Sequence, residues 1–217
     1  MSHWKQDKRD MKIDFEYLDK VFPITANDED QDSTLCVDSQ ADFFGPSYEK
    51  TSELRSPRFP PKRKATPKLS LHSSTLNSVL RGSKFEDLAS TGQSFEKLFS
   101  EEWWLDFQNP CKEALRHVCT AFDVHPLTVE DIWNQETSEK IEQYPSYQFV
   151  CFRSFNEVFE EGELIFKPFT FFQIIFSRGT LSFCFQENNH SKNVEKRIAL
   201  QPNDQAIKSD WMFYSFM

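Results

Sequence analysis

The stretch HPLTVEDIWNQETSEKIEQYPSYQFV, residues 125–150, joins a helix start to an aromatic strand. Pro126 carries the backbone angle that a first helical turn needs, so His125 and Pro126 predict the beginning of a helix. Apolar side chains then recur at helical spacing and predict its buried side: Val129, Ile132 and Trp133. Residues 147–152 are apolar on both alternating faces, which predicts a central strand of the sheet with cover on both of its sides. This stretch favours an α/β domain over a two-layer fold.

The sequence just before this stretch continues the pattern. Residues 104–107 alternate in polarity and predict a strand. Asn109 and Pro110 then predict the cap and the first position of a helix. The side chains expected on the buried side of that helix follow a three-four spacing: Leu115, Val118, Cys119 and Phe122.

The sequence after this stretch predicts more strands and two helices. Residues 162–186 read as strands with a hairpin turn at Arg178-Gly179 and a bend or strand start at Lys167-Pro168. Residues 191–200 predict a helix with three inward side chains: Val194, Ile198 and Leu200. Ser209-Asp210 predicts the cap of a last helix. Together these elements predict a mixed β-sheet covered by helices on both faces.

The first part of the chain has a different composition. Residues 1–84 are rich in Ser, Pro and charged side chains, whereas most of the 23 Phe residues come later. Such a segment cannot bury enough apolar surface to fold alone, so we expect a disordered tail. The folded domain is then expected to span residues 85–217.

Within this tail, residues 55–68 form a basic, proline-rich stretch, RSPRFPPKRKATPK. A solvated charge run is the simplest interpretation. An import signal built on PKRK and a weak contact with anionic lipid are two further interpretations. Phosphorylation of Ser56 or Thr66, each followed by proline, would weaken either of these two functions.

Charge and cysteine content exclude several classes of protein. The net charge is −9, and the predicted folded domain is itself acidic, which argues against nucleic acid as a partner. No apolar segment follows Met1 as a secretory signal, and no apolar run reaches the length of a membrane span. The five cysteines form no C-x-x-C pair, which suits reduced thiols: Cys36, Cys111, Cys119, Cys151 and Cys184.

The sequence shows no pattern of a catalytic site. It has no G-x-S-x-G, G-x-G-x-x-G, P-loop or H-E-x-x-H motif, and only 5 Gly to build phosphate-binding loops. His117 and Cys119 are two positions apart on a predicted helix and therefore point to different faces. Glu130 and Asp131 diverge by about 100° as helix neighbours, so they cannot aim at one ion. We expect these two carboxylates to stabilise the helix end or to pair with Lys140.

Four stretches together resemble the N-terminal cytosolic domain of the CorA-like magnesium transporters, in the fungal branch of the plasma membrane and vacuole. The stretches are WWLDFQNP, AFDVHPLTVEDI, EKIEQYPSYQFVCFRSFN and SDWMFYSFM, and they fall within residues 94–217. The positions that carry the resemblance are expected to have structural roles: Trp104, Asp106, Pro110, His125, Pro126, Leu127, Glu130, Asp131, Lys140 and Tyr147.

The resemblance implies a function in ion transport rather than catalysis. It implies a homopentamer of full-length subunits, with this domain on the cytosolic side and Mg²⁺ as the transported ion. This sequence is expected to end where a stalk helix begins, so that the chain alone would be cytoplasmic and unable to conduct. Membrane contact would come from helices beyond it or weakly from residues 55–68.

Two points limit what the resemblance implies. Pro145 and Ser146 stand where some bacterial members carry acidic residues that help to bind regulatory metal, so no metal site or bound cofactor is predicted. The alternative function is a soluble binding or regulatory protein that retained the fold without the pore. Apolar side chains expected to be exposed in the last helix favour the transporter domain over this alternative: Trp211, Phe213, Phe216 and Met217.

Overall fold

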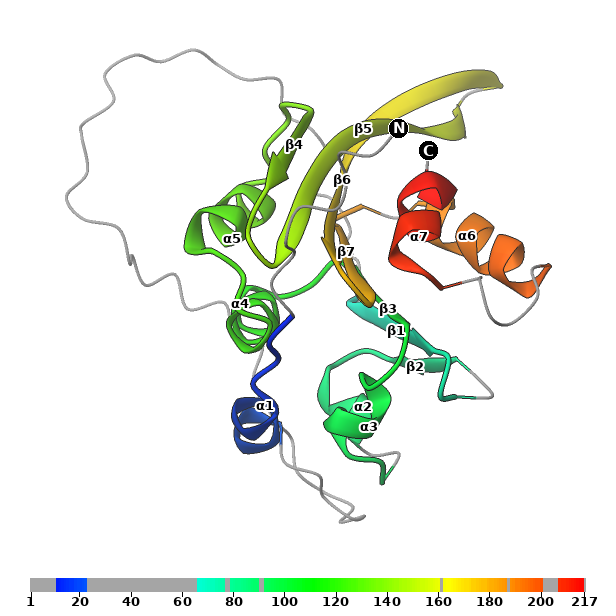
Figure 1. Ribbon diagram of the computed structural model, residues 1–217. Helices are drawn as coiled ribbons and strands as arrows, with labels where there is room; N and C mark the ends of the chain where they lie inside the picture. Colours follow the sequence, from blue (N-terminus) through cyan, green and yellow to red (C-terminus); the bar gives the residue numbers. More distant parts are fainter. Residues whose placement is uncertain are drawn as a thin grey trace, which may run out of the picture.

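A mixed β-sheet forms the centre of the protein (Figure 1). The computed structural model describes residues 11–22, 66–76, 79–89, 92–160, 162–186, 188–200 and 207–216. Within them, seven strands have the order β2-β1-β3-β7-β6-β5-β4. The strand bounds are β1 Lys68–Ser73, β2 Leu80–Gly82, β3 Trp103–Gln108, β4 Lys140–Gln143, β5 Tyr147–Glu160, β6 Glu163–Phe176 and β7 Gly179–Cys184. Neighbouring strands are antiparallel except β3 and β7, which are parallel.

Helices lie on both faces of the sheet, as the sequence predicted (Figure 1). Their bounds are α1 Phe15–Val21, α2 Glu86–Ala89, α3 Phe95–Leu98, α4 Lys112–Ala121, α5 Pro126–Trp133, α6 His190–Ala199 and α7 Ser209–Phe216. Trp103 and Phe107 of β3 belong to the larger core, which also contains the buried side chains of α4 and α5. Trp104 lies on the opposite face in a second core with Phe216 of α7. We call these two sides the α4 face and the α7 face.

Order begins earlier in the chain than residue 85. Three segments of the predicted tail belong to the domain: α1 packs near α4, β1 pairs with β3 along its whole length, and β2 pairs with β1. Leu18 of α1 and Leu71 of β1 are fully buried in the larger core. These segments are too short to show a clear period, and their burial depends on partners far along the chain. The basic residues 55–65 lie outside the described residues.

The helix that follows β3 begins later than predicted. Cys111, not Asn109, is the N-cap of α4, and Pro110 precedes the cap. Asn109 instead has a φ of 53°, a left-handed conformation that Asn tolerates better than most residues. The predicted buried side of α4 is confirmed, because all four of its side chains are almost inaccessible: Leu115, Val118, Cys119 and Phe122.

The helix start at His125-Pro126 is confirmed. His125 is the N-cap of α5, and its Nδ1 accepts a hydrogen bond from the Leu127 backbone N–H at 3.2 Å. Ile132 is fully buried, whereas Val129 and Trp133 are only partly buried against the core. α5 thus covers the α4 face with a narrower apolar side than its sequence indicated.

The strand after β4 is covered on both faces, as predicted, but it is not central. β5 is the second strand from the sheet edge. The bend or strand start expected at Lys167-Pro168 is not found. β6 is continuous there, and Pro168 lies opposite Phe155 of β5. β7 pairs with β6 only from Phe171 onward, so the missing N–H of proline removes no hydrogen bond to β7.

On the N-terminal side of Phe171, β6 pairs only with β5, and the two strands form a ribbon that projects from the sheet (Figure 1). On its other edge, β5 loses β4 after Cys151. We call residues 152–160 and 163–170 the β5–β6 arm. Within the described residues, the two strands of the arm pair only with each other, and the root of the arm also contacts His190 of α6 through Ser154 and Phe169.

The turn at Arg178-Gly179 is confirmed as the β6–β7 hairpin. Gly179 is required there by contact, because an added Cβ would lie 2.0 Å from Cε2 of Trp103. The last two helices differ in part from the prediction. Val194 is buried, but Leu200 is 85% exposed, and Phe216 is buried against Trp104 rather than exposed. Trp211 is half-buried, and the side chains of Phe213 and Met217 lie outside the described part of the structure.

Candidate functional site

Most of the ten residues singled out in the sequence fall into three side-chain clusters. His125 and Tyr147 meet at the start of α5, Asp131 and Lys140 meet between α5 and β4, and Trp104 and Asp106 lie on the α7 face. The other four positions lie next to these clusters or at helix starts: Pro110, Pro126, Leu127 and Glu130. The three clusters therefore do not form a single site.

The first cluster is built around the hydroxyl group of Tyr147. This hydroxyl accepts a hydrogen bond from the backbone N–H of His125 at 3.1 Å and shares a second with the Thr128 hydroxyl at 2.9 Å. Tyr144 stacks on Tyr147 with ring centroids 4.5 Å apart. Burial raises the pKa of Tyr147. The cluster attaches the start of α5 to β5 and uses the tyrosine as a neutral hydrogen-bonding group.

The second cluster joins α5 to β4 through charge. The Lys140 Nζ donates to Asp131 Oδ2 at 2.7 Å and to Glu142 Oε1 at 3.1 Å. The hydrogen bond to Asp131 raises the pKa of Lys140 to about 12, although burial acts in the opposite direction. Glu130, the residue before Asp131 in α5, is exposed to solvent. The predicted pairing of Asp131 with Lys140 is present, and the cation stands where a bound metal ion would have to displace it.

The third cluster is a buried polar chain on the α7 face. Trp104 Nε1 donates to Ser182 Oγ at 2.9 Å, and the Ser182 hydroxyl donates to Asp106 Oδ1. Gln108 Nε2 donates to the other carboxylate oxygen of Asp106 at 3.2 Å. Burial raises the pKa of Asp106, and the hydrogen bond from Ser182 opposes this effect. Asp106 is thus used to join β3 to β7.

A fourth cluster beside it could not be expected from the sequence. His72 of β1 stacks on Trp104 with ring centroids 4.6 Å apart, and its Nε2 lies 3.3 Å from Glu195 Oε1 of α6. Arg81 of β2 reaches the other oxygen of Glu195 at 3.2 Å. Burial dominates and lowers the pKa of His72 to about 4. No local pattern indicated this cluster, because its members come from segments distant in the sequence.

The described thiols and histidines do not form a nucleophilic pair. His117 Nδ1 lies 2.8 Å from the Tyr17 hydroxyl rather than near Cys119. Burial raises the pKa of Cys151 to about 11 and that of Cys184 to about 12, so both remain protonated thiols near neutral pH. These cysteines act as small apolar side chains.

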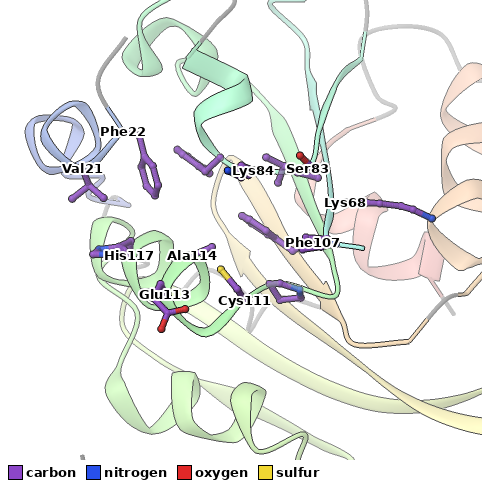
Figure 2. Close-up of a pocket in the computed structure, with 14 residues that line it drawn as sticks. Val21, Phe22, Lys68, Ser83, Lys84, Phe107, Cys111, Glu113, Ala114 and His117 are labelled. Atoms are coloured by element: carbon purple, nitrogen blue, oxygen red, sulfur yellow. The ribbon is translucent and has the colours of Figure 1, made fainter. Parts of the chain in front are cut away.

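A cavity opens between α1, α4 and β1 (Figure 2). Its volume is about 90 Å³, and apolar side chains such as Phe22, Phe107 and Ala114 form much of its wall. Figure 2 shows Lys68 extending away from it. Pockets for drug-sized ligands usually have volumes of about 300–1,000 Å³. This cavity offers no convergent set of charged groups.

Two further properties bear on ion transport. Among the described residues, no group of three or more His, Cys, Asp or Glu side chains is placed to hold a metal ion. In the same residues, no helix combines the length and apolar character that a membrane crossing requires. The described clusters have the chemistry of contacts that hold helices onto a sheet.

The sequence of the chain is similar to those of known transporters of two yeasts. The chain is 38% identical over 144 residues to a putative metal ion transporter of Schizosaccharomyces pombe, covering 65% of this chain and 23% of that protein. It is 35% identical over 153 residues to the magnesium transporter ALR2 of Saccharomyces cerevisiae, covering 69% of this chain and 18% of that protein. The chain thus spans about a fifth of the length of these relatives.

One solved structure and one family model complete the comparison. The soluble domain of CorA from Methanocaldococcus jannaschii superposes with a TM-score of 0.46 and 14% identity, over 68% of this chain and 53% of that one. The model of the family described as "CorA-like Mg2+ transporter protein" matches residues 101–217. Because this match covers more than half of the sequence, from β3 through α7, the chain belongs to the CorA-like Mg²⁺ transporter family.

Proposed function

We propose that this chain is the cytosolic domain of a magnesium transporter of the plasma or vacuolar membrane, and that Mg²⁺ is the ion the whole protein moves. The observation that carries the proposal is the family match, which is continuous from β3 to α7. The similarity to a yeast magnesium transporter supports it. A family of transporters also argues against an enzyme.

The clusters support a role in positioning rather than in binding the ion. Asp131 and Lys140 hold α5 on β4, and Tyr147 holds the start of α5 on β5. A domain kept rigid in this way can transmit force or pack against copies of itself. We include in the proposal that full-length subunits assemble as a homopentamer around one pore, with no nucleic acid partner.

A chimeric transporter tests the proposal. Residues 101–216 of this chain replace the matching segment of the S. cerevisiae transporter ALR2, in cells that lack their own copy. Restored Mg²⁺ uptake, measured with limiting external Mg²⁺, is the expected result. The matched control chimera carries Phe172→Asp, which places a charge in the core and should abolish uptake.

The location of the chimera must be measured in parallel. A chimera that reaches the membrane in normal amounts but moves no Mg²⁺ would contradict the proposed function. Co-purification of two differently tagged chimeras measures self-association separately. Absence of co-purification from detergent extracts would contradict the proposed assembly but not membership of the family.

A further inference from the structure

A buried glutamine on the α7 face has no hydrogen-bond partner. Gln173 of β6 is fully buried, and neither its side-chain Nε2 nor its Oε1 makes a hydrogen bond within the described residues. It lies between Val150 of β5 and Ser182 of β7, its partners in the sheet. Alternation along β6 places it on the same face as Phe171, which belongs to the second core. The amide is therefore enclosed on the α7 side of the sheet.

The neighbouring polar groups do not satisfy this amide. The Ser182 hydroxyl already accepts a hydrogen bond from Trp104 Nε1 and donates one to Asp106. Thr180 of β7 is also fully buried, and its hydroxyl has no partner among the described residues. The same is true of the buried hydroxyl of Ser209, at the start of α7. Polar atoms without partners thus occur both on the sheet and on α7.

The α4 face of the same two strands is apolar at the neighbouring positions. Four side chains are fully buried there in the larger core: Phe172, Ile174, Leu181 and Phe183. Within residues 171–176 of β6 and within β7, the polar side chains therefore occur only on the α7 face.

These unpartnered groups destabilise the closed position of α7. A buried donor or acceptor that has lost water and gained no partner costs free energy, which an apolar group of the same shape does not. α7 packs against both β6 and β7, the strands that carry Gln173 and Thr180 (Figure 1). When α7 lifts from the sheet, water reaches these groups and the cost is recovered. Opening of α7 is thus easier than opening from an apolar surface.

Two kinds of contact hold α7 in its closed position. The ring of Phe216 packs against Trp104 and Phe171, with ring centroids 5.4 and 4.7 Å apart. Arg197 of α6 donates to the backbone carbonyl oxygen of Ser215 at 2.5 Å. α7 contributes no strand to the sheet, so all strand pairing can remain when α7 moves away.

We propose that α7 opens from the sheet as a separate unit, before the rest of the domain unfolds, and that the unpartnered side chains of Gln173 and Thr180 make this opening easier. The sheet is then firmly packed on its α4 face and carries a releasable helix on the other. This device goes beyond the proposed function and does not depend on it.

Hydrogen exchange of the full chain, read by mass spectrometry of peptides from α7 and β7, tests this proposal. Relative to their intrinsic rates, amides of α7 should exchange about tenfold faster than those of β7, because local opening precedes global unfolding. Gln173→Met keeps a similar side-chain volume and removes the unpartnered groups. It should slow the exchange of α7 by about fivefold or more. Thr180→Val, which has nearly the same shape, should act in the same direction.

Ile174→Met is the matched control, because Ile174 is the next residue of β6 and is buried on the α4 face. This change should not slow the exchange of α7. Unchanged or faster exchange of α7 in the Gln173→Met protein would overturn the proposal, since the amide would then have a partner such as ordered water. If circular dichroism shows that this variant does not fold, Thr180→Val decides by the same criterion. Equal protection of α7 and β7 in the unmodified protein would also overturn it, since α7 would then open only with the whole domain.

Discussion

Lys140 of β4 and Asp131 of α5 form an ion pair of 2.7 Å, which connects the helix to the edge strand of the sheet. Both side chains are about a quarter exposed, so solvent weakens the attraction. The pair nevertheless holds two elements that share few other polar contacts. Its role is to fix α5 in place.

Replacing Asp131 by Asn should lower the free energy of unfolding by about 0.5–1 kcal/mol, because the cation loses its closest partner. Urea denaturation measures the change, and Glu130→Gln on the exposed side of α5 is the matched control with little expected effect. Isothermal titration with Mg²⁺ should give the same heat of binding for both variants. A folded Asp131→Asn protein that alone loses Mg²⁺ binding would show that the carboxylate is a ligand.

Replacing Ser182 by Ala should destabilise the protein by about 1–3 kcal/mol, because two buried groups lose their partner at once. Trp104 Nε1 would have no acceptor, and Asp106 would lose a donor. Ser177→Ala in the exposed hairpin turn removes the same hydroxyl where little change is expected. Equal unfolding midpoints for the two variants in urea would mean that the buried hydrogen bonds of Ser182 add nothing to stability.

Acid should weaken the domain through His72. Burial lowers the pKa of this residue from 6.5 to about 4, despite the nearby carboxylate of Glu195. Below pH 6.5 the unfolded chain takes up a proton that the folded one does not, so stability falls as pH falls from 6.5 to about 4. The loss should reach about 1–3 kcal/mol.

The comparison with His72→Gln isolates this effect, since other groups such as Asp106 titrate in both proteins. Unfolding free energies of the two proteins should differ most in their slope between pH 6.5 and 4. Parallel curves would show that His72 is not the group responsible.

Replacing Gly179 by Ala should cost about 3 kcal/mol or more, since the new methyl group would overlap the Trp103 ring and force a shift in the core. Thermal unfolding followed by tryptophan fluorescence measures both the loss and the changed surroundings of Trp103. Arg178→Ala, one position earlier in the exposed turn, serves as the control. A stable Gly179→Ala protein with an unchanged spectrum would contradict the contact.

Two phenylalanines of β6 should respond very differently to the same change. Phe172→Ala removes a fully buried ring and should cost about 3–5 kcal/mol. Phe166→Ala lies on the arm, 57% exposed, and should cost under about 1 kcal/mol. A large loss from Phe166→Ala would mean that the arm is itself part of the core.

Local patterns in the sequence determined much of this architecture. The start of α5 at His125 and Pro126 could be predicted because a capping side chain and a fixed proline angle act within a few residues. The hairpin at Arg178-Gly179 and the buried side of α4 followed for the same reason. The pairing of Asp131 with Lys140 was one of the two roles that the sequence suggested for this carboxylate.

Tertiary structure decided the features that depend on distant partners. β1 is a strand because Leu71 finds β3 and the core, and nothing in its own six residues required this. The hydrogen bonds of Asp106 and His72 could not be predicted either, since β7 and α6 supply their partners. Pro168 is tolerated within β6 only because β7 ends before it. Short-range sterics and capping can be read from a sequence, whereas burial and hydrogen bonding across the sheet exist only once the chain has folded.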